Sequence, residues 1–133
     1  MLRVNPRYYL RYSASMNDKL ILHQCHFSCR IGCTPEERAV PRTIIFDIEL
    51  FFDIKPSAHS DDLKDTFDYM PVHQGIKKLV EGKEYNLIET MAETVADFLV
   101  KNFPIEKVCL RLQKPEPIRQ HGGAWVGIEI TRP

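Results

Sequence analysis

The period of the hydrophobic pattern changes twice along this chain, and that change constrains the fold more than any other feature. Apolar and polar residues alternate in four segments, which predicts half-buried strands over 19–31, 43–54, 107–113 and 124–131. Between the second and third strands, apolar residues recur at helical spacing over 72–80 and 87–99. The order strand, strand, helix, helix, strand, strand (ββααββ) predicts an α+β domain, with two helices on one face of a four-stranded antiparallel sheet.

Turn residues set the expected boundaries of these elements. The first strand is expected to end at Gly32, with an irregularity near Gln24, and residues 34–38 are expected to form a polar loop. The segment 57–70 is polar and turn-rich, Gly82 closes the first helix, and Pro104 stops the second. The first two strands therefore read as a hairpin.

A four-stranded sheet leaves two edge strands whose backbone groups need partners. Pairing of edges between subunits would close a barrel, which implies a symmetric homo-oligomer. The pattern alone leaves this assembly as a hypothesis.

The first 17 residues differ from the rest of the chain. They carry Arg3, Arg7 and Arg11, and no acidic residue precedes Asp18. Two interpretations stand: a mitochondrial transit peptide, or an extra arm upstream of a functional start at Met16, and the shortness of the segment favours the arm. We therefore expect an N-terminal extension over 1–17 and one domain over 18–133.

Composition excludes several classes of partner. Eighteen basic residues balance 18 acidic ones, so bulk charge indicates neither a nucleic acid nor a polybasic membrane contact. The apolar runs are far shorter than the ~20 residues that span a bilayer. Three of the four cysteines crowd into nine residues, 25–33, a poor arrangement for disulfides. We expect reduced thiols and a cytoplasmic protein.

Glu89 has two possible roles. Asn86 is a favourable N-cap and Glu89 follows three residues later, which is the pattern of a structural capping box. A carboxylate at a helix N-terminus also lies beside free N–H donors, and that pairing suits a ligand with adjacent N–H groups and a carbonyl. The spacing alone favours the structural role.

Other candidate residues are weaker when taken singly. Lys114 ends a strand, Tyr69 follows an acidic run, and Glu36 and Glu37 lie in the loop after Gly32. Each residue type at such a position is usually solvated or packed. They become informative only as a set.

A cluster of zinc-type ligands, His23, Cys25, His26, Cys29 and Cys33, also needs weighing. On a strand, the three cysteines would spread over roughly 26 Å at ~3.3 Å per residue. Zinc ligands must instead converge on one point, and neither a CxxC nor an HxxxH pair occurs here. We therefore expect no metal site.

From about Asp18 to Arg132, the chain resembles the dihydroneopterin aldolases. The matching segments are IGCTPEER, IIFDIEL, SDDLKDTFDY, EGKEYNLIETMAE, LQKPEPI and VGIEITR. The resemblance implies the tunnelling fold, whose subunits form tetrameric rings that commonly stack as octamers. It also implies a folate-pathway lyase without metal or cofactor, which cleaves 7,8-dihydroneopterin into 6-hydroxymethyl-7,8-dihydropterin and glycolaldehyde.

The resemblance also implies roles for particular residues. Glu89 would anchor the pterin by accepting hydrogen bonds from the 2-amino and N3–H groups of the ring, and the backbone near Ile88 would face the ring. Lys114 would lie at the reaction centre, with Glu37 near the side-chain hydroxyls. Tyr69 and Phe67 would come from a neighbouring subunit, and Tyr69 would take part in proton transfer.

One departure and two rival functions accompany this resemblance. The loop before the last strand reads IRQHGGAW, with Arg119 and His121 where the family often has small residues, so the mouth of the pocket is in question. The same fold serves dihydroneopterin-triphosphate epimerases, and C2′ epimerisation is an expected side activity of the aldolases. A non-catalytic pterin-binding module is the remaining alternative, although it would not need Glu89, Lys114 and Tyr69 together.

Overall fold

The computed structural model describes residues 17–115 and 121–133, which contain a four-stranded antiparallel sheet in the order β1-β2-β3-β4. The strands are β1 (Lys19–Cys29), β2 (Arg42–Phe51), β3 (Lys107–Lys114) and β4 (Val126–Arg132). The predicted sheet is confirmed. The first strand ends at Cys29 rather than at Gly32, and Ile31 instead forms an isolated parallel bridge with Tyr85.

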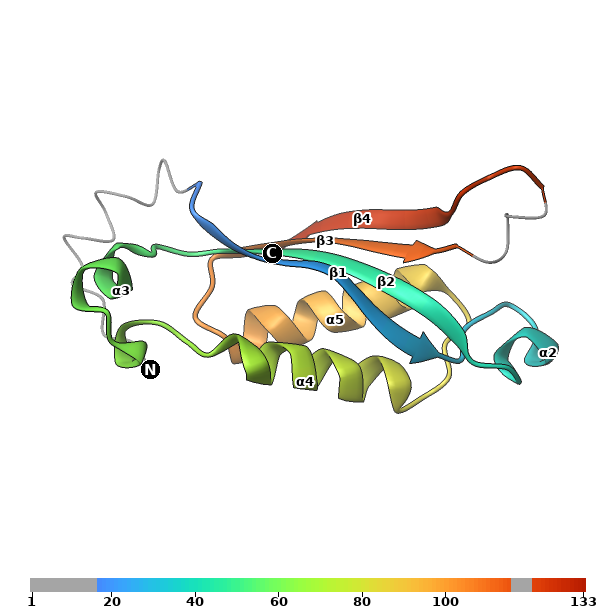
Figure 1. Ribbon diagram of the computed structural model, residues 1–133. Coiled ribbons are helices and arrows are strands. Elements are labelled where there is room, and N and C mark those ends of the chain that lie inside the picture. The colour runs from blue at the N-terminus through green and yellow to red at the C-terminus, as the bar shows by residue number, and fades with distance from the viewer. Residues whose placement is uncertain (1–16, 116–120) are drawn as a thin grey trace.

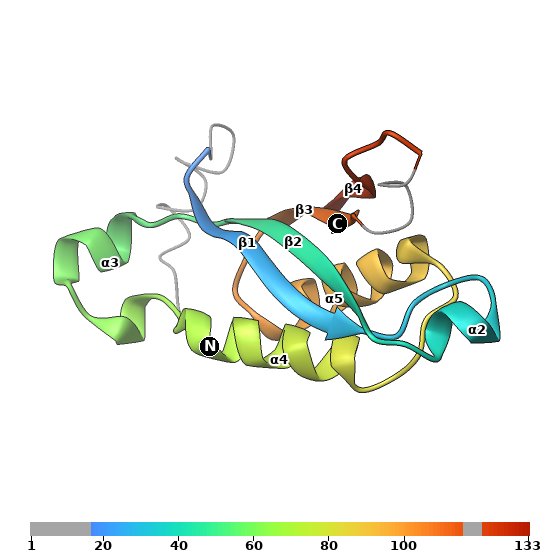
Figure 2. The ribbon, with the colours of Figure 1, turned by 45° about the vertical axis from the view of Figure 1, so that its right-hand side comes forward.

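Helices α4 (Tyr69–Glu81) and α5 (Ile88–Asn102) cover one face of this sheet, as predicted (Figures 1 and 2). Alternate residues of the strands face them, and the buried side chains of the two central strands are Ile44, Phe46, Ile48, Leu50, Val108, Leu110 and Leu112. From the helices, the core receives Val72, Ile76, Val80, Met91, Ala92, Val95, Ala96 and Leu99. Burial of this apolar surface is the main stabilising contribution to the domain.

Close packing of the two helices depends on Gly75. A Cβ atom at this position would lie 2.2 Å from the Phe98 ring. The missing side chain lets the α5 aromatic ring lie directly against the α4 backbone. A larger residue would separate the helices.

Two segments expected to be loops contain short helices. These are α2 (Pro35–Arg38), and α3 (Lys55–Ser60) with the 3₁₀ turn η2 (Leu63–Asp65). In α2 the Thr34 hydroxyl accepts a hydrogen bond from the Glu37 N–H at 3.2 Å. A hydroxyl cap followed by proline favours a helical turn even in a polar segment, and hydrophobic periodicity cannot detect so short an element.

The expected irregularity near Gln24 is a β-bulge. Gln24 has a φ of 55°, and the β1–β2 register shifts between Leu22 and Cys25. Its N–H leaves the ladder and donates to Asp47 Oδ1 at 2.8 Å. The bulge therefore bends β1 while its freed donor keeps a partner.

The sheet face opposite the helices carries many charged side chains beside a few apolar ones such as Ile21 and Ile45, and it has ion pairs between strands. Examples are Lys19 with Glu49, and Arg111 with Glu129 at 3.2 Å. Within residues 17–115 and 121–133, β1 and β4 remain unpaired edges of the sheet. None of the helices in these ranges has the length and apolarity needed to cross a membrane.

Candidate functional site

Glu37 and Lys114 form a charged pair where the segment after β1 meets the end of β3. Lys114 Nζ lies 3.5 Å from Glu37 Oε2. Lys114 has the same strand parity as Leu110 and Leu112, so its side chain points toward the helix-covered face and is only 11% exposed. A nearly buried ammonium group requires a carboxylate partner, and the tertiary structure supplies one from 77 residues away.

The turn that carries Glu37 packs tightly against Gly32. A Cβ atom at Gly32 would lie 2.4 Å from Glu37 Cβ and 2.8 Å from Glu37 Oε2. The Glu37 side chain thus packs directly against the backbone at Gly32. Glu36, one position earlier, is exposed, and the glutamate that lies beside Lys114 is Glu37.

A short backbone ladder ties this turn to the segment before α5. The Gly32 N–H donates to the Tyr85 carbonyl at 3.0 Å, and the Tyr85 N–H donates to the Arg30 carbonyl at 3.0 Å. The Tyr85 side chain is buried, and its hydroxyl donates to the Leu79 carbonyl at 3.0 Å. Burial raises the pKa of the Tyr85 phenol, with a smaller contribution from Cys29, which keeps this hydroxyl a donor.

Glu89 lies in the first turn of α5, but it is not part of a capping box. The N-cap residue is Leu87, which makes no side-chain hydrogen bond, so the prediction that Asn86 caps this helix is wrong. Glu89 is exposed, and the first intrahelical bond runs from the Met91 N–H to the Leu87 carbonyl at 3.3 Å. The N–H groups before Met91 therefore have no helical acceptor and can bind a ligand beside the Glu89 carboxylate.

One end of the molecule brings these groups together. The N-terminus of α5 lies at the same end as α2 and the last residues of β3 (Figure 1). This end of the molecule therefore holds the Glu89 carboxylate and the first N–H groups of α5, together with the nearly buried Lys114 and its partly exposed partner Glu37. Such an arrangement can anchor a planar heterocycle and move a proton beside it.

Tyr69 and Phe67 lie at the opposite end of the molecule, where α4 begins (Figures 1 and 2). Tyr69 is the first residue of α4 and is 57% exposed. The Phe67 ring is partly buried between Phe52, at 4.9 Å, and Phe103, at 5.6 Å. A single chain therefore does not bring these two residues to Lys114.

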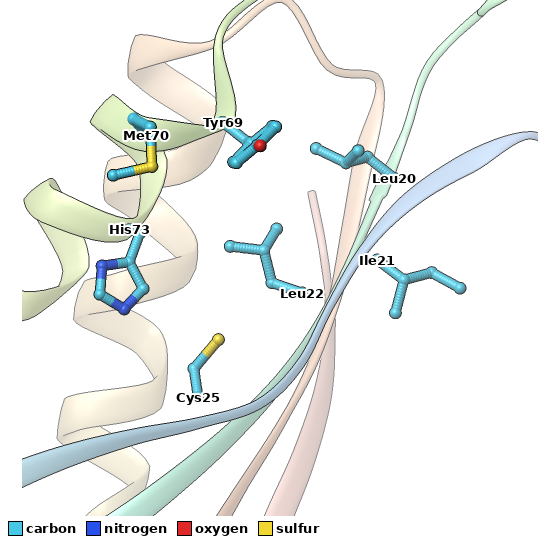
Figure 3. A pocket seen from close by; sticks show the side chains of 7 residues that line it. All are labelled: Leu20, Ile21, Leu22, Cys25, Tyr69, Met70 and His73. Carbon is cyan, nitrogen blue, oxygen red and sulfur yellow. The ribbon is translucent and has the colours of Figure 1, made fainter.

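Tyr69 lines an apolar pocket of about 430 Å³ between α4 and β1. Figure 3 shows the Tyr69 ring facing β1 across this space, with His73 one turn further along α4. The lining residues are Leu20, Ile21, Leu22, Cys25, Tyr69, Met70 and His73. The pocket lies beside β1, which is an edge strand of the sheet in the described part of the chain.

The His/Cys cluster is dispersed in the fold. Across residues 17–115 and 121–133, no three His, Cys, Asp or Glu side chains are grouped to hold a metal ion. Cys29 is buried, and burial, followed by the charge of Glu81, raises the pKa of its thiol to about 12. Cys33 is exposed, so these two thiols face different surroundings.

Some features of the site have no signal in the sequence pattern. At Gly32 the pattern predicts only the end of a strand, and it does not distinguish Arg38, whose guanidinium donates to the Gly32 carbonyl at 2.9 Å. The close approach of Gly32 to Glu37 has no signature in spacing. Arg119, in the loop that differs from the family pattern, lies outside the described residues, and His121 of the same loop is exposed.

Comparisons with known proteins show the family to which this chain belongs. The family model described as "FolB: Dihydroneopterin aldolase" matches residues 20–131. Dihydroneopterin aldolase of Streptococcus pyogenes serotype M18 is 37% identical over 118 residues, covering 86% of this chain and 98% of the relative. Dihydroneopterin aldolase 1 of Arabidopsis thaliana is 35% identical over 124 residues, covering 92% of this chain and 85% of the relative.

A solved structure shows the same architecture. The chain superposes on Escherichia coli dihydroneopterin aldolase in complex with neopterin with a TM-score of 0.82 and 31% identity. The superposition covers 87% of this chain and 99% of the other. The fold described above is therefore that of a protein whose bound ligand is a pterin.

Proposed function

The chain belongs to the dihydroneopterin aldolase family, and we propose that it performs the family's reaction with the Lys114–Glu37 pair at the reaction centre. It is an aldehyde-lyase of folate biosynthesis whose substrate is a small pterin. The observation that carries the assignment of the site is the nearly buried Lys114 Nζ, 3.5 Å from Glu37 Oε2, at the end of the molecule where α5 begins.

The reaction needs few protein groups because the substrate contains its own electron sink. In 7,8-dihydroneopterin, the C6=N5 imine adjoins the side chain. Removal of the 2′-hydroxyl proton lets the C1′–C2′ bond break, its electrons move into the imine, and glycolaldehyde leaves. A proton delivered to C1′ then gives 6-hydroxymethyl-7,8-dihydropterin, so neither a Schiff base with the enzyme nor a metal is required.

Lys114, Tyr69 and a water molecule form the proposed proton relay. Lys114 is nearly buried and lies 3.5 Å from Glu37. In this proposal, Glu37 lies near the hydroxyls of the substrate side chain. A positioned acid–base group of this kind contributes a rate factor of about 10² to 10⁴. The same relay supports C2′ epimerisation, because the cleaved fragments can recombine on the other face.

Glu89 anchors the pterin ring in this proposal. Its two oxygens accept hydrogen bonds from the 2-amino and N3–H groups, and the N–H groups beside Ile88 face the ring. The exposure of Glu89 and the absence of a capping bond at the start of α5 support this role, since the carboxylate is available to a ligand.

A neighbouring chain supplies Tyr69 and Phe67 in this proposal. Both residues lie at the far end of the chain from Lys114, and Tyr69 faces an apolar pocket beside the unpaired edge of β1. Pairing of β1 and β4 edges between copies would close a ring, either a tetramer or two stacked tetramers, and complete each site. We place this assembly in the cytoplasm.

Incubation with 7,8-dihydroneopterin, following glycolaldehyde release, tests the function. Lys114→Ala should lower kcat by about 10² to 10⁴ while the dissociation constant of a pterin rises by tenfold at most. Lys101→Ala, which removes an exposed lysine late in α5, is the matched control and should react at the normal rate. A Lys114→Ala protein that binds pterin poorly but turns over bound substrate normally would contradict the assignment.

A further inference from the structure

The carboxylate of Glu37 is placed by a turn of only a few residues, and one side chain closes that turn. Arg38 Nη1 donates a hydrogen bond of 2.9 Å to the Gly32 carbonyl. The backbone N–H of Arg38 also donates to the Thr34 carbonyl at 3.2 Å. Arg38 therefore joins the start and the end of the turn that contains Glu37.

Gly32, the residue that Arg38 holds, is also the residue against which Glu37 packs. The atom that a Gly32 side chain would meet first is Glu37 Cβ, at 2.4 Å. A Cβ atom cannot move by a change of rotamer, so its place depends on the backbone of α2. The position of Glu37 is thus determined by the distance between α2 and Gly32, and the Arg38 guanidinium spans that distance.

A second guanidinium holds the other side of the turn. Arg30 Nη1 donates to the Arg38 carbonyl at 3.3 Å and also to the Ala39 carbonyl. Arg30 is exposed, whereas the Arg38 hydrogen bond is partly buried, so water competes less with Arg38 for its acceptor. Of the two arginines, only Arg38 bonds to Gly32, the residue against which the Glu37 side chain packs.

We propose that Arg38 is a positioning residue of the reaction, which acts by holding α2 against Gly32 so that the Glu37 carboxylate stays beside Lys114. The inference rests on the proposed role of Glu37, because Arg38 acts only through that carboxylate. Displacement of a reacting group by about 1 Å can cost as much as 10²-fold in rate. Loss of the guanidinium should therefore affect kcat more than KM, since the ring anchor at Glu89 is on another element.

The test compares Arg38→Met and Arg38→Lys in two backgrounds. Arg38→Met keeps the aliphatic stem and removes every donor, and it should lower kcat by about 10- to 100-fold with KM changed less than about threefold. Arg38→Lys keeps a positively charged donor group and should recover most of the rate. Arg132→Met removes a guanidinium at the end of β4 that is bonded to Glu93 of α5, opposite the start of β3. It controls for loss of stability and should keep the normal kcat.

The Glu37→Gln background separates positioning from a general structural effect. If Arg38 acts through Glu37, adding Arg38→Met to Glu37→Gln should lower kcat by less than about twofold further. An equal loss in both backgrounds, or a normal kcat for Arg38→Met beside an impaired Glu37→Gln, would overturn the inference.

A crystal structure of Arg38→Met distinguishes this inference from the proposed function. We expect the Glu37 carboxylate to move out of hydrogen-bonding distance of Lys114, and an unmoved carboxylate would refute the positioning role. Full activity of Glu37→Gln, together with a displaced carboxylate in Arg38→Met, would leave the positioning intact and refute the catalytic role of Glu37.

Discussion

Glu89 illustrates how the structure separates two roles that coincide in the sequence. The pattern Asn86 to Glu89 is that of a capping box, yet α5 begins one residue later than the pattern implies, with Leu87 as its N-cap. The Glu89 carboxylate therefore has no capping role, and its contribution to stability is limited to its favourable interaction with the helix dipole, about 0.3–1 kcal/mol.

Glu89→Ala should consequently weaken pterin binding much more than it destabilises the protein. Loss of one side of a charge-assisted pair of hydrogen bonds costs about 2–4 kcal/mol, which is roughly a 30- to 1,000-fold rise in the dissociation constant. Fluorescence titration with a pterin and urea unfolding measure the two effects. Glu93→Ala, which removes another α5 glutamate that pairs with Arg132, should leave pterin affinity unchanged. Unchanged affinity in Glu89→Ala would refute the anchor.

At the scale of elements, the position of Tyr69 depends on the stability of the first turn of α4. Asp68 is the N-cap of α4, and its Oδ1 accepts a hydrogen bond from the Met70 N–H at 2.9 Å. Tyr69 lies between these two residues at the start of the helix. Fraying of this turn would therefore release Tyr69 before it disturbed the buried residues further along α4.

Asp68→Ala should lower the free energy of unfolding by about 0.5–2 kcal/mol, since it removes an N-cap. If Tyr69 takes part in proton transfer, kcat should fall as well. In a Tyr69→Phe background, adding Asp68→Ala should then change kcat very little. Asp97→Ala, which removes one partner of an exposed pair with Lys101, should change stability by about 0.5 kcal/mol or less. Urea unfolding and steady-state rates provide both measurements, and a full kcat in Asp68→Ala with a lowered stability would separate the cap from the chemistry.

At the scale of the whole molecule, the two groups of proposed site residues lie at opposite ends of one chain. Glu37 and Lys114 are near the start of α5, whereas Tyr69 is at the start of α4 (Figure 1). If each site combines residues from two neighbouring chains in a ring, two inactive variants can complement each other. In such a ring, Lys114→Ala removes a group that one chain supplies to the site, and Tyr69→Phe removes a group that its neighbour supplies.

Co-refolding of equal amounts of Lys114→Ala and Tyr69→Phe should therefore restore activity. In a cyclic ring with random mixing, about one site in four combines an intact Lys114 with an intact Tyr69 from its neighbour. Recovery to roughly a quarter of the normal rate is expected, and each variant refolded alone is the control. Activity that stays at the level of the separate variants would show that both residues act within one chain.

Hydrophobic periodicity by itself determined most of the architecture. The alternating segments predicted all four strands, and the helical spacing predicted α4 and α5 on one sheet face, because side-chain burial in these elements repeats with the backbone period. The irregularity at Gln24 and the end of α4 at Gly82 were also predicted, since each breaks or ends a local pattern. A helix of four residues such as α2 spans barely one turn, so no apolar pattern can repeat within it, and its formation depends on the cap instead.

Tertiary structure alone decided which polar residues meet. Lys114 and Glu37 are 77 residues apart, and only the close approach of α2 to Gly32 brings Glu37 to the end of β3. Spacing could not distinguish Glu89 as a cap from Glu89 as a free carboxylate, because a shift of one residue in the helix start changes the partner of every first-turn group. Such contacts depend on distances in the folded chain, which a local sequence pattern does not contain. The helices and strands, in contrast, follow from the regular spacing of apolar residues along the sequence.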